Sequence, residues 1–171
     1  MELSVADLQN DDAISAFGDD EQGKHAVVNI RCVLFELNSE IYGINVKKIR
    51  EVLRVGEIRT VEGCPEKVLG IINVRGVIVT VVDTRKSYNI KPKEVDDLSR
   101  IIIVELDGDD TVGMMVDSVL EVKDIPEKQF EAISSTNAGS SKYIQAIAHF
   151  QDKVIILIDV DNMFDTGVLD E

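Results

Sequence analysis

The most specific stretch of the sequence is GIINVRGVIVTVVDTR, residues Gly70–Arg85. Two runs rich in β-branched residues, Leu69–Val74 and Val77–Asp83, flank the dipeptide Arg75-Gly76. Because β-branched side chains favour strands and glycine readily adopts the positive φ of a tight turn, this stretch predicts a β-hairpin. Short apolar runs separated by polar turns continue on both sides of it. The sequence therefore predicts an all-β protein with a few short helices.

A weak internal repeat extends this pattern along the chain. Apolar matches between strands are common by chance, but a glycine and a glutamate that both recur at the same spacing are not. We therefore infer two copies of a unit of five strands and about 70 residues. Such a small sheet leaves two bare edges unless it curls, so we expect two five-stranded barrels that pack against each other. The matched residues are Gly43, Val46, Ile49, Glu51 and Val52 with Gly113, Val116, Val119, Glu121 and Val122, displaced by 70; Glu36-Leu37 with Glu105-Leu106, displaced by 69; and Val79, Val81, Val82, Asp83 and Tyr88 with Ile155, Leu157, Ile158, Asp159 and Phe164, displaced by 76.

Composition divides the chain into three parts. Residues 1–26 are predicted to be an acidic disordered tail, since the first 24 hold seven acids and one base. The alternative is a short amphipathic docking helix through Val5, Leu8, Asp12 and Ile14. The folded domain is expected over residues 27–164, with its two halves meeting near residues 89–99. An open alternative is that the two halves share the first strand. Residues 165–171 are expected to be a C-terminal tail.

Charge and hydropathy exclude several kinds of partner. The net charge of −14 opposes binding to nucleic acid or to anionic lipid. The longest apolar runs, such as Val77–Val82 and Val154–Ile158, are far shorter than the ~20 residues that span a bilayer. Two cysteines, Cys32 and Cys64, without a secretion signal at Met1 indicate a protein of the reducing cytoplasm.

The sequence contains no pattern typical of a catalytic, metal or cofactor site. It has no GxSxG, CxxC, HExxH or Walker-type motif, and the acids of 107–110 lack EF-hand spacing. We therefore expect neither an enzyme nor a bound metal or cofactor. At the predicted hairpin tip, however, Asn73 and Arg75 stand between apolar strands. Arginine's planar donors suit a directed contact with a partner, although Arg75 could merely solubilise the tip.

These residues resemble the CheW family of bacterial chemotaxis coupling proteins. The resemblance covers roughly Arg31 to Phe164, and its most specific part is the hairpin stretch quoted above. Further matches occur in the expected order along the chain. They are IREV at 49–52, CPEKVLG at 64–70, VGMMVDSVLEV at 112–122 and VIILIDVDNMF at 154–164.

The resemblance implies two five-stranded SH3-like β-barrels packed around a shared core. It also implies a non-catalytic adaptor in the cytoplasm, clustered with membrane chemoreceptors. Such an adaptor joins the cytoplasmic helical tip of methyl-accepting chemoreceptors to the regulatory domain of the histidine kinase CheA. Contacts between copies of this chain in array rings are an open alternative. The residues expected at the receptor are Ile49, Glu51, Gly70, Asn73 and Arg75, with Val119 and Val122 as weaker candidates for either partner.

The sequence departs from the family pattern at a few positions. The chain has Thr80 where the family often has proline and Thr84 where the family often has leucine. Glu62 stands where proline is frequent, and Ala146 where glycine is common. These departures leave open whether the chain is a main coupling protein or a paralogue that scaffolds a specialised chemosensory complex.

Overall fold

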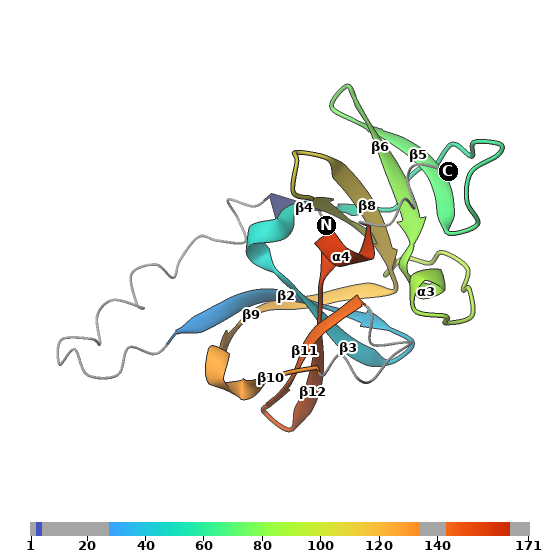
Figure 1. The fold of residues 1–171 in the computed structure, drawn as a ribbon. Helices are drawn as coiled ribbons and strands as arrows, with labels where there is room; N and C mark the ends of the chain where they lie inside the picture. The colour runs from blue at the N-terminus through green and yellow to red at the C-terminus, as the bar shows by residue number, and fades with distance from the viewer. Residues whose placement is uncertain (1–2, 5–27, 134–142, 165–171) are drawn as a thin grey trace.

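The computed structural model describes residues 3–4, 28–133 and 143–164, and these residues form two β-sheets (Figure 1). The sheets have strand orders β1-β4-β7-β8-β6-β5 and β10-β11-β12-β3-β2-β9. The first sheet contains β1 (Leu3–Ser4), β4 (Ile49–Arg54), β5 (Val68–Val74), β6 (Val77–Asp83), β7 (Arg100–Glu105) and β8 (Thr111–Val116). The second contains β2 (Asn29–Leu37), β3 (Glu40–Asn45), β9 (Ser118–Pro126), β10 (Phe130–Ala132), β11 (Ile144–Phe150) and β12 (Lys153–Ile158).

The helical elements of the described residues are all short. They are the single turns η1 (Val46–Lys48) and η2 (Glu127–Gln129) and the four-residue helices α3 (Thr84–Ser87) and α4 (Val160–Met163). Each four-residue helix begins after an aspartate whose side chain accepts a backbone N–H: Asp83 from Arg85 at 3.0 Å and Asp159 from Asn162 at 3.1 Å. The predicted mostly β fold with a few short helices is confirmed.

The strand pairing reproduces the internal repeat. Each sheet has five strands that correspond one to one, in the orders β4-β7-β8-β6-β5 and β9-β2-β3-β12-β11, and β1 and β10 are additions. The register corresponds as well. Leu157 lies opposite Gly43 in the parallel pair β12–β3, and Val81 lies opposite Gly113 in the parallel pair β6–β8.

Each sheet combines strands from both repeats. The first sheet takes β4, β5 and β6 from the first repeat and β7 and β8 from the second, whereas the second sheet takes β2 and β3 with β9, β11 and β12. Segment 89–99, where we expected the halves to meet, therefore joins two strands of the same sheet. This corrects the expected division, because sequence similarity marks equivalent strands without saying which copy each strand pairs with.

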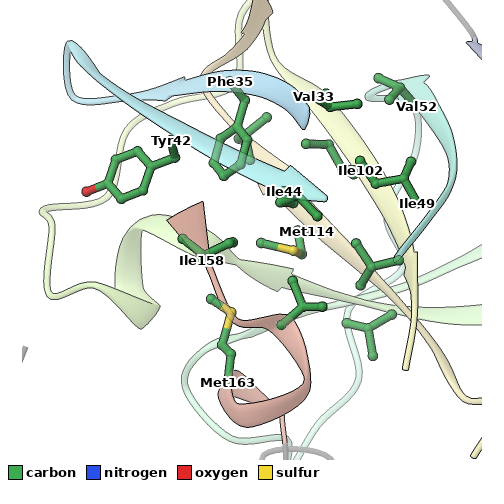
Figure 2. Packing of buried hydrophobic residues seen from close by; sticks show 14 of the residues in the cluster. Val33, Phe35, Tyr42, Ile44, Ile49, Val52, Ile102, Met114, Ile158 and Met163 are labelled. Atoms are coloured by element: carbon green, nitrogen blue, oxygen red, sulfur yellow. The ribbon is translucent and has the colours of Figure 1, made fainter. Parts of the chain in front are cut away.

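The buried apolar side chains of the described residues form three clusters, one within each sheet and one between the sheets. In β7, Ile101 and Ile103 face the cluster inside the first sheet, while Ile102 and Val104 face the cluster between the sheets. Both faces of such a strand are buried, which explains its continuous apolar run. Figure 2 shows Phe35, Ile44, Met114 and Ile158 gathered in the cluster between the sheets, the shared core that the sequence predicted.

Two ion pairs, which we call latches, join elements of the two sheets at equivalent places. In the first latch the Arg85 guanidinium, on α3, donates to both carboxylate oxygens of Asp117 at 2.8 Å. Asp117 also accepts the Asn38 N–H at 2.9 Å. Burial works against ionisation of Asp117, but the Arg85 and Asn38 hydrogen bonds outweigh it and lower the pKa of Asp117.

The second latch has the charges exchanged. Asp161, on α4, pairs with Lys48 at 2.5 Å and accepts the Asp107 N–H at 2.9 Å. Its side chains are more exposed, at 33% for Lys48 and 29% for Asp161, against 12% for Arg85 and 11% for Asp117. Burial again opposes ionisation, but the Lys48 and Asp107 hydrogen bonds lower the pKa of Asp161.

Two residues of the predicted N-terminal tail pair with the domain. Leu3 and Ser4 form β1, antiparallel to β4, with Leu3 opposite Val52 and Ser4 opposite Glu51. The rest of that tail, including the alternative docking helix, lies outside the described residues, as does the predicted C-terminal tail. No helix in the described part of the chain is long and apolar enough to cross a bilayer.

Candidate functional site

The β5–β6 hairpin places a charged residue at an exposed tip. Figure 1 shows this hairpin extending away from the second sheet. The turn residues Arg75 and Gly76 have φ values of 50° and 87°, as the two-residue turns of β-hairpins require. Asn73 fastens the turn, because its Oδ1 accepts the Gly76 N–H at 2.8 Å. The predicted hairpin is confirmed, and the positive φ of Arg75 is an addition to it.

Arginine rarely adopts a backbone conformation with positive φ, and doing so carries a conformational cost. At Arg75 this conformation is accompanied by a specific side-chain contact. The Arg75 Nη2 donates to the Glu51 carboxylate on β4. In a flat sheet, β4 and β5 would stand four strands apart, roughly 19 Å at the usual strand spacing. The contact therefore shows that the first sheet curls until its far strand meets the hairpin tip.

The two partners of this ion pair differ in exposure. The Arg75 side chain is 73% exposed, whereas the Glu51 side chain is 10% exposed. A largely buried carboxylate thus holds one side of an exposed guanidinium in place. The planar guanidinium carries five N–H donors, a geometry that suits a carboxylate or carbonyl of a second molecule.

The structure separates the five predicted receptor residues into two groups. Glu51, Asn73 and Arg75 come together around the hairpin tip. Ile49 is 2% exposed and belongs to the cluster between the sheets, and Gly70 is also buried. Ile49 and Gly70 therefore lie in the interior and offer no exposed surface to a partner.

Gly70 has a strict steric reason to be glycine. Its φ is 152°, and a Cβ added there would lie 2.2 Å from the Arg59 carbonyl oxygen. Gly70 sits at a bulge in the β5–β6 pairing, next to the Arg59–Ile71 bridge. Any side chain at Gly70 would push the segment around Arg59 away from the hairpin.

Exposed apolar residues beside Arg75 were missed by the sequence reasoning. Val77 is 57% exposed and Ile78 is 58% exposed, immediately after the turn. Ile78 also lines an open pocket on the hairpin face together with Glu57, Arg59, Ile71, Ile72 and Asn73. The apolar run of Val77–Asp83 predicted a strand without indicating that its first two side chains would be exposed. The tip thus offers charged and apolar groups together, as protein interfaces do.

The weaker candidates lie on β9 in the second sheet. Val119 and Val122 are half-buried and pack against the cluster between the sheets. On the same strand Leu120 is 45% exposed and Glu121 is exposed. At β9 it is therefore the side chains next to the predicted valines that face outward.

Side chains of the kinds that ligate metals do not form a cluster within residues 28–133 and 143–164. No group of three or more His, Cys, Asp or Glu there could hold a metal ion. Both cysteines are free thiols. Burial, with a smaller contribution from the Asp124 charge, raises the pKa of the Cys32 thiol to about 12, so this thiol stays protonated at neutral pH.

Comparison with known proteins gives a consistent result. The CheW-like domain model matches residues 31–167. The chain is 25% identical over 132 residues to the chemotaxis protein CheW of Klebsiella aerogenes, covering 77% of this chain and 79% of that protein. It is 28% identical over 136 residues to the chemotaxis protein CheW of Bacillus subtilis, covering 79% of this chain and 86% of that protein.

A solved structure has the same fold. The crystal structure of the scaffolding protein TtCheW from Thermoanaerobacter tengcongensis aligns with a TM-score of 0.77 and 33% identity. The alignment covers 84% of this chain and 98% of that one. The likeness therefore includes both sheets and not one repeat alone.

Proposed function

The chain belongs to the CheW family of non-catalytic chemotaxis scaffolding proteins, and on that premise we propose that it couples chemoreceptors to the histidine kinase CheA. It would do so in the cytoplasm, bound to the helical tips of methyl-accepting receptors and to the regulatory domain of the kinase. Holding both partners at once raises the concentration of the kinase at the receptor and fixes its orientation.

The observation that carries this proposal is the anchored arginine at the β5–β6 tip. Glu51 orients the Arg75 guanidinium, Asn73 fixes the turn beneath it, and Val77 and Ile78 add exposed apolar surface. Pre-orientation lowers the entropy lost when a partner binds, and a charged anchor ringed by apolar groups is typical of binding hot spots. We assign this surface, the Arg75 face, to the receptor tip.

An adaptor needs a second surface for its second partner. The exposed side chains of β9, next to Val119 and Val122, lie in the other sheet. We propose them as the weaker candidate surface, for the kinase or for the receptor. Signal transfer would further require that these contacts differ in affinity between receptor states, since equal affinity shifts no equilibrium.

The test is reconstitution of the three-component complex from purified parts. A receptor cytoplasmic fragment on beads should retain the regulatory domain of CheA only when this chain is present. Arg75→Glu should lose the receptor while it still binds the kinase domain free in solution. If the chain binds neither partner, or binds only one of them, the coupling function is refuted.

A further inference from the structure

The β4 edge of the first sheet carries a strand that has no equivalent in the second sheet. On one side β4 pairs with β7, and on its other side it pairs with β1, the residues Leu3 and Ser4. The equivalent strand β9 forms the outer edge of its sheet, and no described strand pairs with that edge. An edge strand presents unpaired N–H and C=O groups that accept an added strand. Among the described residues, an added strand covers this particular edge only in the sheet that bears Arg75, since β10 is added at the opposite edge of the second sheet.

The added strand lies at the position that anchors the Arg75 face. Ser4 is opposite Glu51, the residue whose carboxylate contacts Arg75, and Leu3 is opposite Val52. A group that contacted the β4 backbone at these two residues would have to displace β1. A partner on the Arg75 face that reaches β4 therefore meets an edge that is already occupied.

Charge favours the chain's own N-terminus at this edge. The segment from Val46 to Arg54 carries four basic residues and one acid, in a protein whose net charge is −14. The first 24 residues carry seven acids and one base. Opposite charges on the two segments raise the local concentration of the N-terminus near β4, and salt weakens this attraction.

We propose that β1 is a built-in competitor, a strand of the same chain that occupies the β4 edge and that the receptor tip displaces when it binds the Arg75 face. The inference rests on the proposed function, since it assigns the receptor to that face. β1 is only two residues long, so it is easily displaced. Its removal should tighten receptor binding by about three- to tenfold, the worth of one backbone hydrogen bond.

The experiment compares two double variants of the full chain. Leu3→Pro/Ser4→Pro removes the backbone donors and blocks strand pairing, whereas Leu3→Ala/Ser4→Ala keeps the backbone and serves as the matched control. Amide hydrogen exchange at Glu51 and Val52 reports the pairing, and calorimetric titration with a receptor cytoplasmic-tip fragment reports the competition. We expect the proline variant to exchange faster and bind more tightly, by a factor that shrinks at high salt, while the alanine variant matches the wild type.

Three results would overturn the inference. Exchange at Glu51 and Val52 that the prolines leave unchanged would show that the edge is not covered in solution. Faster exchange with unchanged receptor affinity would show that the strand does not compete. A dimer that the prolines abolish would show that the strand is added to a second copy. Failure of the proposed function has a different signature, in which no variant binds the tip, although the prolines still change exchange at β4.

Discussion

The β5–β6 and β11–β12 hairpin tips, which are equivalent in the two repeats, have the same backbone turn and different chemistry. Arg75 and Gly76 have φ values of 50° and 87°, and their counterparts Gln151 and Asp152 have values of 52° and 63°. Behind the first tip, Arg75 contacts the largely buried Glu51. At the equivalent place in the second sheet, Glu121 is exposed and pairs at 3.7 Å with Lys123 on its own strand. The duplicated unit thus keeps its fold in both copies, while the anchored arginine belongs to one.

The two latches between the sheets show the same contrast, with equivalent positions in the fold and different side chains. Both use an aspartate that accepts a turn N–H and pairs with a base, but the charges are exchanged and the burial differs. The position of a latch therefore follows from the fold. Its strength depends on how well its charges are shielded from water.

Unequal strength of the two latches gives the largest expected effect. Arg85→Ala leaves the Asp117 carboxylate buried with the Asn38 N–H as its remaining hydrogen bond, so we expect a loss of about 3 kcal/mol in unfolding free energy. Lys48→Ala breaks the more exposed pair and should cost less than about 1 kcal/mol. Urea denaturation of both variants measures the difference. Equal losses would show that burial does not set the strength of the latches.

The repeated glycines sharpen the comparison of the two sheets. A Cβ at Gly113 would lie 2.9 Å from the Ile101 Cγ2, whereas the nearest atom to a Cβ at Gly43 is the Leu34 Cδ2 at 3.3 Å. Overpacking should make Gly113→Ala cost about 2 kcal/mol. Gly43→Ala should cost less than about 1 kcal/mol, because a leucine tip can yield and alanine restricts the unfolded chain. Thermal unfolding tests the order, and a larger loss at Gly43 would refute it.

The smallest expected change is a gain in stability at the start of α3. Thr84 is fully buried, and its Oγ1 has no hydrogen-bond partner among the described residues. The equivalent position in the second repeat is Val160, which is 2% exposed. Thr84→Val has the same shape without the unpaired hydroxyl, so it should raise the unfolding free energy by about 1 kcal/mol. A loss measured by urea denaturation would mean that the hydroxyl is satisfied in solution.

Much of the fold could be predicted, because the repeat includes matched positions that chance rarely produces. The glycine and the glutamate of the repeat identified equivalent strands, and those strands do occupy equivalent places. What could not be predicted is which copy each strand joins, since both copies have the same apolar pattern. The exchange of strands between repeats is a long-range outcome without a local signal.

The candidate site was predicted in part for a similar reason. Asn73 and Arg75 could be placed at a turn from the local sequence alone. The burial of Ile49 and the pairing of Arg75 with Glu51 depend on how far the sheet curls, which no local pattern records. β6 shows the opposite case, because its sequence is typical of a strand and yet its first two residues, Val77 and Ile78, are exposed at the tip.

The most direct test of this account compares one substitution at the two hairpin tips. Arg75→Glu and Gln151→Glu place the same charge at the same turn position of each sheet, and calorimetric titration with a receptor cytoplasmic-tip fragment measures each affinity. We predict a loss of at least about tenfold for Arg75→Glu and a change below about twofold for Gln151→Glu, with both proteins folded by circular dichroism. Equal losses, or unchanged binding by a folded Arg75→Glu protein, would contradict the assignment of the receptor surface to the first sheet.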